Sequence, residues 1–252
     1  MRIPFVALLG VLASTIVAGL ALAEPATIDS GTFVVYQGAR AVGTETFSIV
    51  ADNDKLFMRS AVVQQVPTPD GDRKLDKTLE LVATRFDFGL KTYKSTQKFK
   101  DRELGRGVSV AETTIAIYRE IDQSGVGNVL ALPPGRLFLI DPMMFSLFEY
   151  MCLSFHGHTF DTRPISVLVL GPTDSLLEAR VTDLGQEAIR WGAKPVQARR
   201  LKIGDDRTTF EAWVGPTGGL LRLELPGQDL RVERTAPAVK PRRRPGTPTP
   251  DG

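Results

Sequence analysis

The chain has 252 residues, of which 42% are hydrophobic and 24% charged, so it has enough apolar material for one large domain or two small ones. Its single cysteine excludes an internal disulfide, so a hydrophobic core has to supply the stability. The net charge of +2 is uneven: without Arg2 and the four basic and one acidic residues after Val239, 26 basic and 28 acidic residues remain. This slightly acidic body argues against nucleic acid as a partner.

The first 23 residues have the layout of a secretory signal peptide. Arg2 precedes an apolar run, and Ala21 and Ala23 form an A-x-A pattern that predicts cleavage after Ala23. The alternative is a membrane anchor, because the run approaches the ~20 residues that span a bilayer. The Glu24-Pro25 that follows favours cleavage. We therefore expect a periplasmic mature protein that has no transmembrane segment once the signal is removed.

Alternation of period two dominates from Gly31 onward. GTFVVYQG and VGTETFSIV flank a turn at Gly38, which predicts a β-hairpin. Further strands are predicted at KLFMRSAVVQQV, LDKTLELVATRF and LKTYKSTQKF, with PTPDGD as a turn. VSVAETTIAIYRE alternates over nearly its whole length, which indicates one long strand, and GVGN at 125–128 is typical of a turn.

One segment, DPMMFSLFEYMCLSF, has helical spacing instead. Asp141 is a suitable helix N-cap, and Pro142 suits the first helical position because its missing N–H is not needed there. Apolar residues then recur at helical spacing, and Gly157 is a suitable stop. The pattern predicts a buried helix near residues 141–153.

The second half of the chain returns to strands. PISVLVLG is continuously apolar, which indicates burial on both faces. SLLEARVTDLG, QEAIRW, VQARRLKIG, TTFEAWVG, LLRLELP and DLRVER follow at close intervals. The eleven to thirteen strands of this count, without βαβ alternation, predict a single mainly β domain over 24–236. We expect a curved antiparallel sheet that forms an incomplete barrel of about eleven strands around a central helix.

The last residues, 237–252, are rich in proline and basic, which predicts a disordered tail. Two interpretations remain open for it. The tail is either a solubilising terminus or a basic segment that contacts an envelope protein or an anionic surface.

The stretch FEYMCLSFHGHTFD holds the only cysteine, Cys152, and both histidines, His156 and His158. Zinc prefers such ligands, but only Cys152 and His156 have the i, i+4 spacing that shares a helix face. Neither C-x-x-C nor H-E-x-x-H accompanies them, and no G-x-S-x-G nucleophile motif occurs. We expect a packed helix that runs into a polar turn, with no catalytic residue, no bound metal and no cofactor.

Three local patterns resemble a known family. They are Y-x-G-x-x-x-G-T from Tyr36, P-P-G-x-L from Pro133, and A-R-R-L-x-I with F-x-A-W-V-G-P-T-G-G-L-L-R-L-E between Ala198 and Glu224. Together they are similar to exported bacterial proteins of unsettled activity whose fold is like that of the LolA/LolB lipoprotein carriers. The resemblance implies an incomplete β-barrel of about eleven strands, with a helix against its concave face. In the carriers that concavity receives acyl chains.

The favoured hypothesis is a non-enzymatic binder or carrier of an apolar, lipid-like ligand, because Met- and Phe-rich surfaces adapt to varied shapes. A structural or interaction module of the cell envelope with a filled core is the alternative, and a metal-dependent hydrolase is the third. The candidate ligand-binding residues are Met143, Met144, Phe145, Phe148 and Met151 of the helix and Phe33, Phe57, Phe86, Phe210 and Trp213 of the strands.

Overall fold

The computed structural model describes residues 24–68, 71–99, 102–121, 124–205 and 207–236. The predicted signal peptide, its cleavage point after Ala23 and the predicted basic tail from residue 237 lie outside the described residues.

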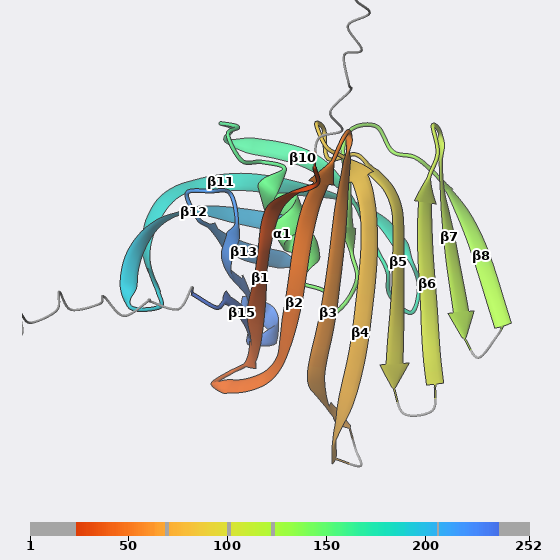
Figure 1. The fold of residues 1–252 in the computed structure, drawn as a ribbon, viewed down its shortest axis with the longest axis horizontal. Helices are drawn as coiled ribbons and strands as arrows, with labels where there is room; N and C mark the ends of the chain where they lie inside the picture. The colour runs from red at the N-terminus through yellow and green to blue at the C-terminus, as the bar shows by residue number, and fades with distance from the viewer. Residues whose placement is uncertain (1–23, 69–70, 100–101, 122–123, 206, 237–252) are drawn as a thin grey trace, which may run out of the picture.

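The described chain is mainly β and forms one large open sheet of fifteen strands with a single α-helix (Figure 1). The first half supplies β1 (Ala26–Gln37), β2 (Arg40–Asp52), β3 (Lys55–Thr68), β4 (Gly71–Thr84), β5 (Leu90–Phe99), β6 (Arg102–Val110), β7 (Thr114–Ile121) and β8 (Ser124–Ala131). The second half supplies β9 (Leu137–Ile140), α1 (Ser146–Leu153), β10 (Thr162–Val169), β11 (Ser175–Trp191), β12 (Lys194–Gly204), β13 (Thr209–Val214), β14 (Leu220–Leu225), a short 3-10 turn η1 (Pro226–Gln228) and β15 (Leu230–Arg234).

The sheet consists of two meanders joined edge to edge. Strands β1 to β8 pair in sequence order, strands β10 to β15 do the same, and β1 pairs with β15 between them. The first and last strands therefore lie side by side in the middle of the sheet. The two free edges, β8 and β9, are consecutive in the chain, and they do not pair with each other. Strand β9 is parallel to β10, a connection that requires a crossover, and α1 lies in that crossover.

The prediction of about eleven strands is wrong, because period-two alternation does not mark where a strand turns. The stretch predicted as one strand, VSVAETTIAIYRE, is the end of β6, a tight turn and all of β7 except its last residue. The Ala111 amide donates to the Thr114 carbonyl at 2.9 Å and closes that turn. GVGN, predicted as a turn, lies within β8. In contrast, the predicted hairpin of β1 and β2 is confirmed, with Gly38 at φ 59° in its turn.

The helix begins later than predicted, at Ser146 instead of near Asp141. Asp141 does not cap it. The cap is the buried carboxylate of Glu45 from β2, which accepts hydrogen bonds from the Phe145 amide at 2.6 Å and the Ser146 amide at 3.1 Å. The early part of the predicted helix, including Met143 at φ 70°, is a turn instead. A residue about a hundred positions away thus fixes where the helix starts, which local sequence does not reveal.

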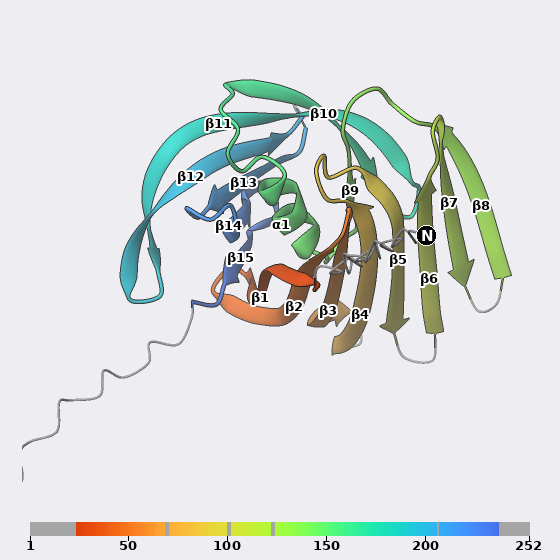
Figure 2. The same ribbon diagram turned by 45° about the horizontal axis from the view of Figure 1, so that its top comes forward.

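The sheet bends so that its two halves flank the helix, as the turned view shows (Figure 2). All eight helix residues are buried, and the six that are neither Ser146 nor Glu149 belong to one hydrophobic core with the inward-facing residues of both meanders. Arginines of β6 and β7 in the first meander bind the turn between β10 and β11 in the second. Arg106 donates to the Gly171 carbonyl at 3.0 Å, and Arg119 donates to the Asp174 carboxylate at 2.8 Å, both in the turn between β10 and β11.

Within the described ranges, no helix combines the length and the apolar character that crossing a bilayer requires.

Candidate functional site

The concave face of the sheet is filled by side chains of α1 and of the turn before it. Met151 is fully buried, and Phe148 packs against Phe210 of β13 with ring centroids 4.7 Å apart. Phe33 of β1 is also fully buried and stacks on Phe47 at 4.8 Å. The core brings together six of the ten predicted ligand-binding residues, namely Phe33, Met144, Phe145, Phe148, Met151 and Phe210.

The other four predicted residues lie apart from that group. Met143 is half-buried in the turn before α1. Phe57 faces away from the core on β3, and Phe86 in the turn after β4 is 84% exposed. Trp213 belongs to a second cluster on the opposite face of the sheet, where its ring lies between the guanidinium groups of Arg200 and Arg222.

A buried ion pair fixes the turn before the helix to the first meander. The Lys77 ammonium of β4 donates to the Asp141 carboxylate and, at 2.9 Å, to the Pro142 carbonyl. The hydroxyls of Tyr93 and Ser95 on β5 donate to the other oxygen of Asp141. Burial lowers the pKa of Lys77, and the neighbouring Asp141 carboxylate opposes that shift. Every charge of this group has a partner, which is the condition for burying charges at all.

A second buried acid, Glu149, fixes the middle of the helix. One of its oxygens accepts a hydrogen bond from the Leu220 amide at 2.6 Å and lies 3.6 Å from the Arg234 guanidinium. Arg234 in turn donates to Asp29 at 2.7 Å. Burial, together with the proximity of Asp29, raises the pKa of Glu149 well above its usual range. Both causes favour the neutral form of this carboxyl group over the charged one.

The cysteine and histidine stretch separates in space. Cys152 is buried in the core, where burial raises the pKa of its thiol, whereas His156 and His158 are exposed in the turns after α1. In the part of the chain that the structure describes, no three His, Cys, Asp or Glu residues gather as a metal site would require.

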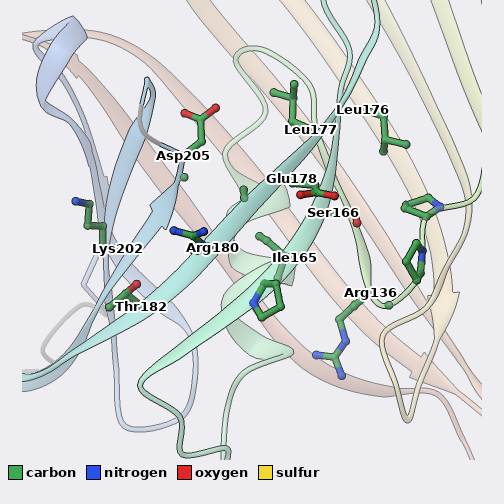
Figure 3. Close-up of a pocket in the computed structure, with 16 residues that line it drawn as sticks. Arg136, Ile165, Ser166, Leu176, Leu177, Glu178, Arg180, Thr182, Lys202 and Asp205 are labelled. Atoms are coloured by element: carbon green, nitrogen blue, oxygen red, sulfur yellow. The ribbon is translucent and has the colours of Figure 1, made fainter.

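A pocket of ≈ 750 Å³ lies beside strands β10 and β11 (Figure 3). It is bounded by the loop 133–136, which carries the Pro-Pro-Gly motif, and by residues of β10, β11 and the end of β12. The loop is attached to the sheet, because the Ser166 amide of β10 donates to the Arg136 carbonyl at 3.2 Å. Ile165, Leu177 and Ala179 give the pocket an apolar part, and its volume lies within the roughly 300–1,000 Å³ of ligand sites.

The pocket also contains charged side chains from three elements. Figure 3 shows Arg180 and Lys202 on one side of the view and Arg136 on the other. Arg136 already donates to the Ser154 carbonyl at 2.9 Å, and Asp205 accepts hydrogen bonds from two backbone amides of its own turn. The pocket therefore combines an apolar surface with a few polar groups, the composition expected of a small-molecule site.

None of the ten residues predicted from the sequence lines this pocket. The P-P-G-x-L motif lies in the loop, but it carried no prediction of a site, and it does not reveal the partners of the loop on β10 to β12. The sequence LEARVT gives a weak indication of the pocket wall, because Glu178, Arg180 and Thr182 alternate there with Ala179 and Val181. That alternation gives the faces of a strand, but it does not show that a distant loop covers one of them.

No family model, curated protein or solved structure matches this chain.

Proposed function

We propose that the protein is a periplasmic, non-enzymatic binder or carrier of an apolar, lipid-like ligand. The observation that carries this proposal is the open pocket beside the Pro-Pro-Gly loop, on a sheet whose concave face is already filled by α1. The ligand is therefore assigned to the pocket and not to the Met- and Phe-rich surface of the helix. The proposal includes the architecture of the LolA/LolB carriers, which is an incomplete barrel around a central helix.

The pocket suits an elongated apolar chain. Leu177 of β11 is 43% exposed at its wall, although exposing leucine to water costs free energy unless something covers it. Ile165 and the two prolines of the loop, Pro133 and Pro134, extend the apolar surface. The buried acids Glu45, Asp141 and Glu149 hold the helix in place, so the pocket can be occupied without displacing the core.

The test is native mass spectrometry of the protein purified from a periplasm, repeated after denaturation. We expect a loss of one lipid-sized mass from the wild type. Leu177→Arg places a charge in the pocket wall and should reduce the bound fraction at least tenfold. Leu184→Arg is the matched control, because Leu184 lies on the same strand, is 47% exposed and does not line the pocket. An equal loss of ligand in both variants, or no ligand in the wild type, would contradict the proposal.

Strand β8 supports a second candidate function, docking of an envelope protein. Seven of its eight residues are exposed and none is charged, with Val126 72% and Val129 64% exposed. Natural edge strands are usually short, charged or covered. The other edge, β9, has only four residues, three of them buried, so it meets that rule. An extended segment of a partner would pair with the free backbone groups of β8.

Photo-crosslinking in intact periplasm tests the second candidate. A photoreactive residue at Val126 should give one product of defined mass. The same residue at Phe86, which is 84% exposed and distant from β8 in sheet order, should not. Equal labelling from both positions would reject docking at β8. Contact of the basic tail with an anionic surface stays a prediction, since residues 237–252 lie outside the described ranges.

A further inference from the structure

We infer that a second copy of this chain binds the free edge of β8, so that the two β8 strands pair antiparallel about a twofold axis. The inference goes beyond the ligand carrier proposed above and does not depend on a bound ligand. It names the occupant of the edge that the second candidate function leaves to another envelope protein. An interface of this kind is isologous, which means that both copies contribute the same surface.

Strand β8 ends the sheet, and its outer edge pairs with none of the described elements. The strand order gives it one neighbour, β7, and both ribbon views show it as the outermost strand (Figures 1 and 2). The pairing of β7 with β8 runs without a register shift from Thr114 and Ala131 to Ile121 and Ser124. The edge is therefore regular, with no bulge that would keep a further strand away.

Exposed apolar side chains concentrate at this edge. Among the described residues ten large hydrophobic side chains are exposed, and four of them lie on β7 and β8, namely Tyr118, Ile121, Val126 and Val129. The register places Tyr118 and Val129 on one side of the sheet and Ile121 and Val126 on the other. Apolar surface thus reaches the edge on both sides, and a further strand beside β8 covers both at once.

The absence of charge on β8 favours a copy of the same strand as its partner. A twofold axis brings the two copies of every side chain on the strand close together, so a charged strand would repel itself. The sequence of β8, SGVGNVLA, contains neither an acid nor a base. On β7, Arg119 and Glu120 lie one strand further in, and Arg119 donates to the Asp174 carboxylate at 2.8 Å. A different partner does not require such neutrality, because opposite charges can serve for its recognition.

One register brings each valine of β8 opposite a smaller or polar residue. With Gly127 on the axis, Val129 of one copy faces Gly125 of the other copy. Val126 faces Asn128 of the other copy in the same way. The residues of each pair are an even number of positions apart, so both side chains lie on the same side of the sheet.

Tyr118 gives a further reason for this register. A Cβ at Gly125 would overlap the hydroxyl and the ring of Tyr118, so the ring lies over that glycine. The Tyr118 side chain is nevertheless 48% exposed. Val129 of the other copy, opposite Gly125 and on the same side of the sheet, would cover the ring. Aromatic and β-branched side chains stabilise a sheet when they meet across neighbouring strands.

The test measures self-association of the full mature protein by sedimentation equilibrium. We expect a dimer, and a wild type that stays monomeric at about 100 μM would overturn the inference. Val126→Lys changes a side chain that is 72% exposed in the single chain and covered in the pair. It should raise the dissociation constant about tenfold or more, because each pair loses two covered valines. Val63→Lys is the matched control, since Val63 is 43% exposed on β3, away from both sheet edges, and it should leave the dissociation constant unchanged.

A second substitution tests the register and the identity of the partner. Asn128→Asp alone should weaken self-association. Val126→Lys/Asn128→Asp places an ammonium opposite a carboxylate twice across the axis, so it should associate about fivefold more tightly than Val126→Lys. Recovery also shows that the single variant had not failed to fold. No recovery would overturn the pairing about Gly127.

Crosslinking from Val126 in intact periplasm separates this inference from the proposed functions. A product of twice the mass of the chain supports a second copy. A product with another protein would overturn the inference and leave the second candidate function standing, and no product at all would overturn both. The ligand proposal is unaffected by either result, because the pocket lies on β10 to β12 and not on β8.

Discussion

The polar groups around the helix and those of the pocket differ in how their charges are satisfied. Lys77 and Asp141 are 3% and 2% exposed, and each is bonded to the other and to a further group. Arg180 and Lys202 are exposed and have no partner among the described residues. The first set is buried under the sheet, and the second set lines the pocket beside it. Only the first set forms hydrogen bonds and ion pairs within the described chain.

The difference indicates which charges the folded architecture requires. A buried charge without a partner is costly, so the interior set has to be complete in the folded chain. An exposed charge costs little whether or not it is paired, so the pocket set can stay unpaired in the folded chain. The following predictions separate the two sets, from the largest effect on stability to the smallest.

Removing one member of the interior pair should have the largest effect. Asp141→Ala leaves the Lys77 ammonium buried without its partner, and it removes the acceptor of Tyr93 and Ser95. We expect the free energy of unfolding to fall by about 3–5 kcal/mol. Urea unfolding followed by circular dichroism measures it. The double variant Lys77→Met/Asp141→Leu should recover most of the loss, and a loss of under about 1 kcal/mol in Asp141→Ala would show that the pair is not structurally required.

The pH dependence of stability should change when Glu149 is replaced. Because the folded chain raises the pKa of this carboxyl, the unfolded chain releases the proton first as the pH increases. Stability should therefore decline from the ordinary pKa of glutamate upward, until the pH reaches the raised pKa of Glu149. Glu149→Gln, which still accepts from the Leu220 amide, should make that decline shallower by at most the slope of one proton.

Urea midpoints from about pH 5 to about pH 8 measure the effect. The decline should not vanish in Glu149→Gln, because burial also raises the pKa of Glu45. Asp29 and Arg234 face Glu149, but the pKa of Asp29 is lowered and that of Arg234 is raised, so neither titrates in this interval. Parallel curves for the wild type and the variant would contradict a raised pKa of Glu149.

Removing the pocket cations should have the smallest effect on stability. Arg180→Ala/Lys202→Ala deletes no hydrogen bond or ion pair of the described chain, so the free energy of unfolding should stay within about 0.5 kcal/mol of the wild type. The same urea experiment measures it. A loss of about 2 kcal/mol or more would show that the two residues contribute to the architecture of the sheet.

Much of the fold followed from local pattern. The alternation of TFVVY and of TETFSIV predicted the β1–β2 hairpin, and the continuous run ISVL predicted the strand buried on both faces, which is β10. The number of strands did not follow, because β6, its turn and β7 share one uninterrupted alternation. The buried helix was expected, but its first residue was not, because Glu45 caps it from β2.

By itself the sequence determined a mainly β chain with one buried helix, since periods of two and 3.6 residues are properties of neighbouring positions. Only the tertiary structure decided which charges meet. Lys77 lies 64 positions from Asp141, and the loop at 133–136 reaches the wall of β10 to β12 only after the sheet has bent. Such contacts depend on register and curvature over the whole sheet, and no window of sequence contains them.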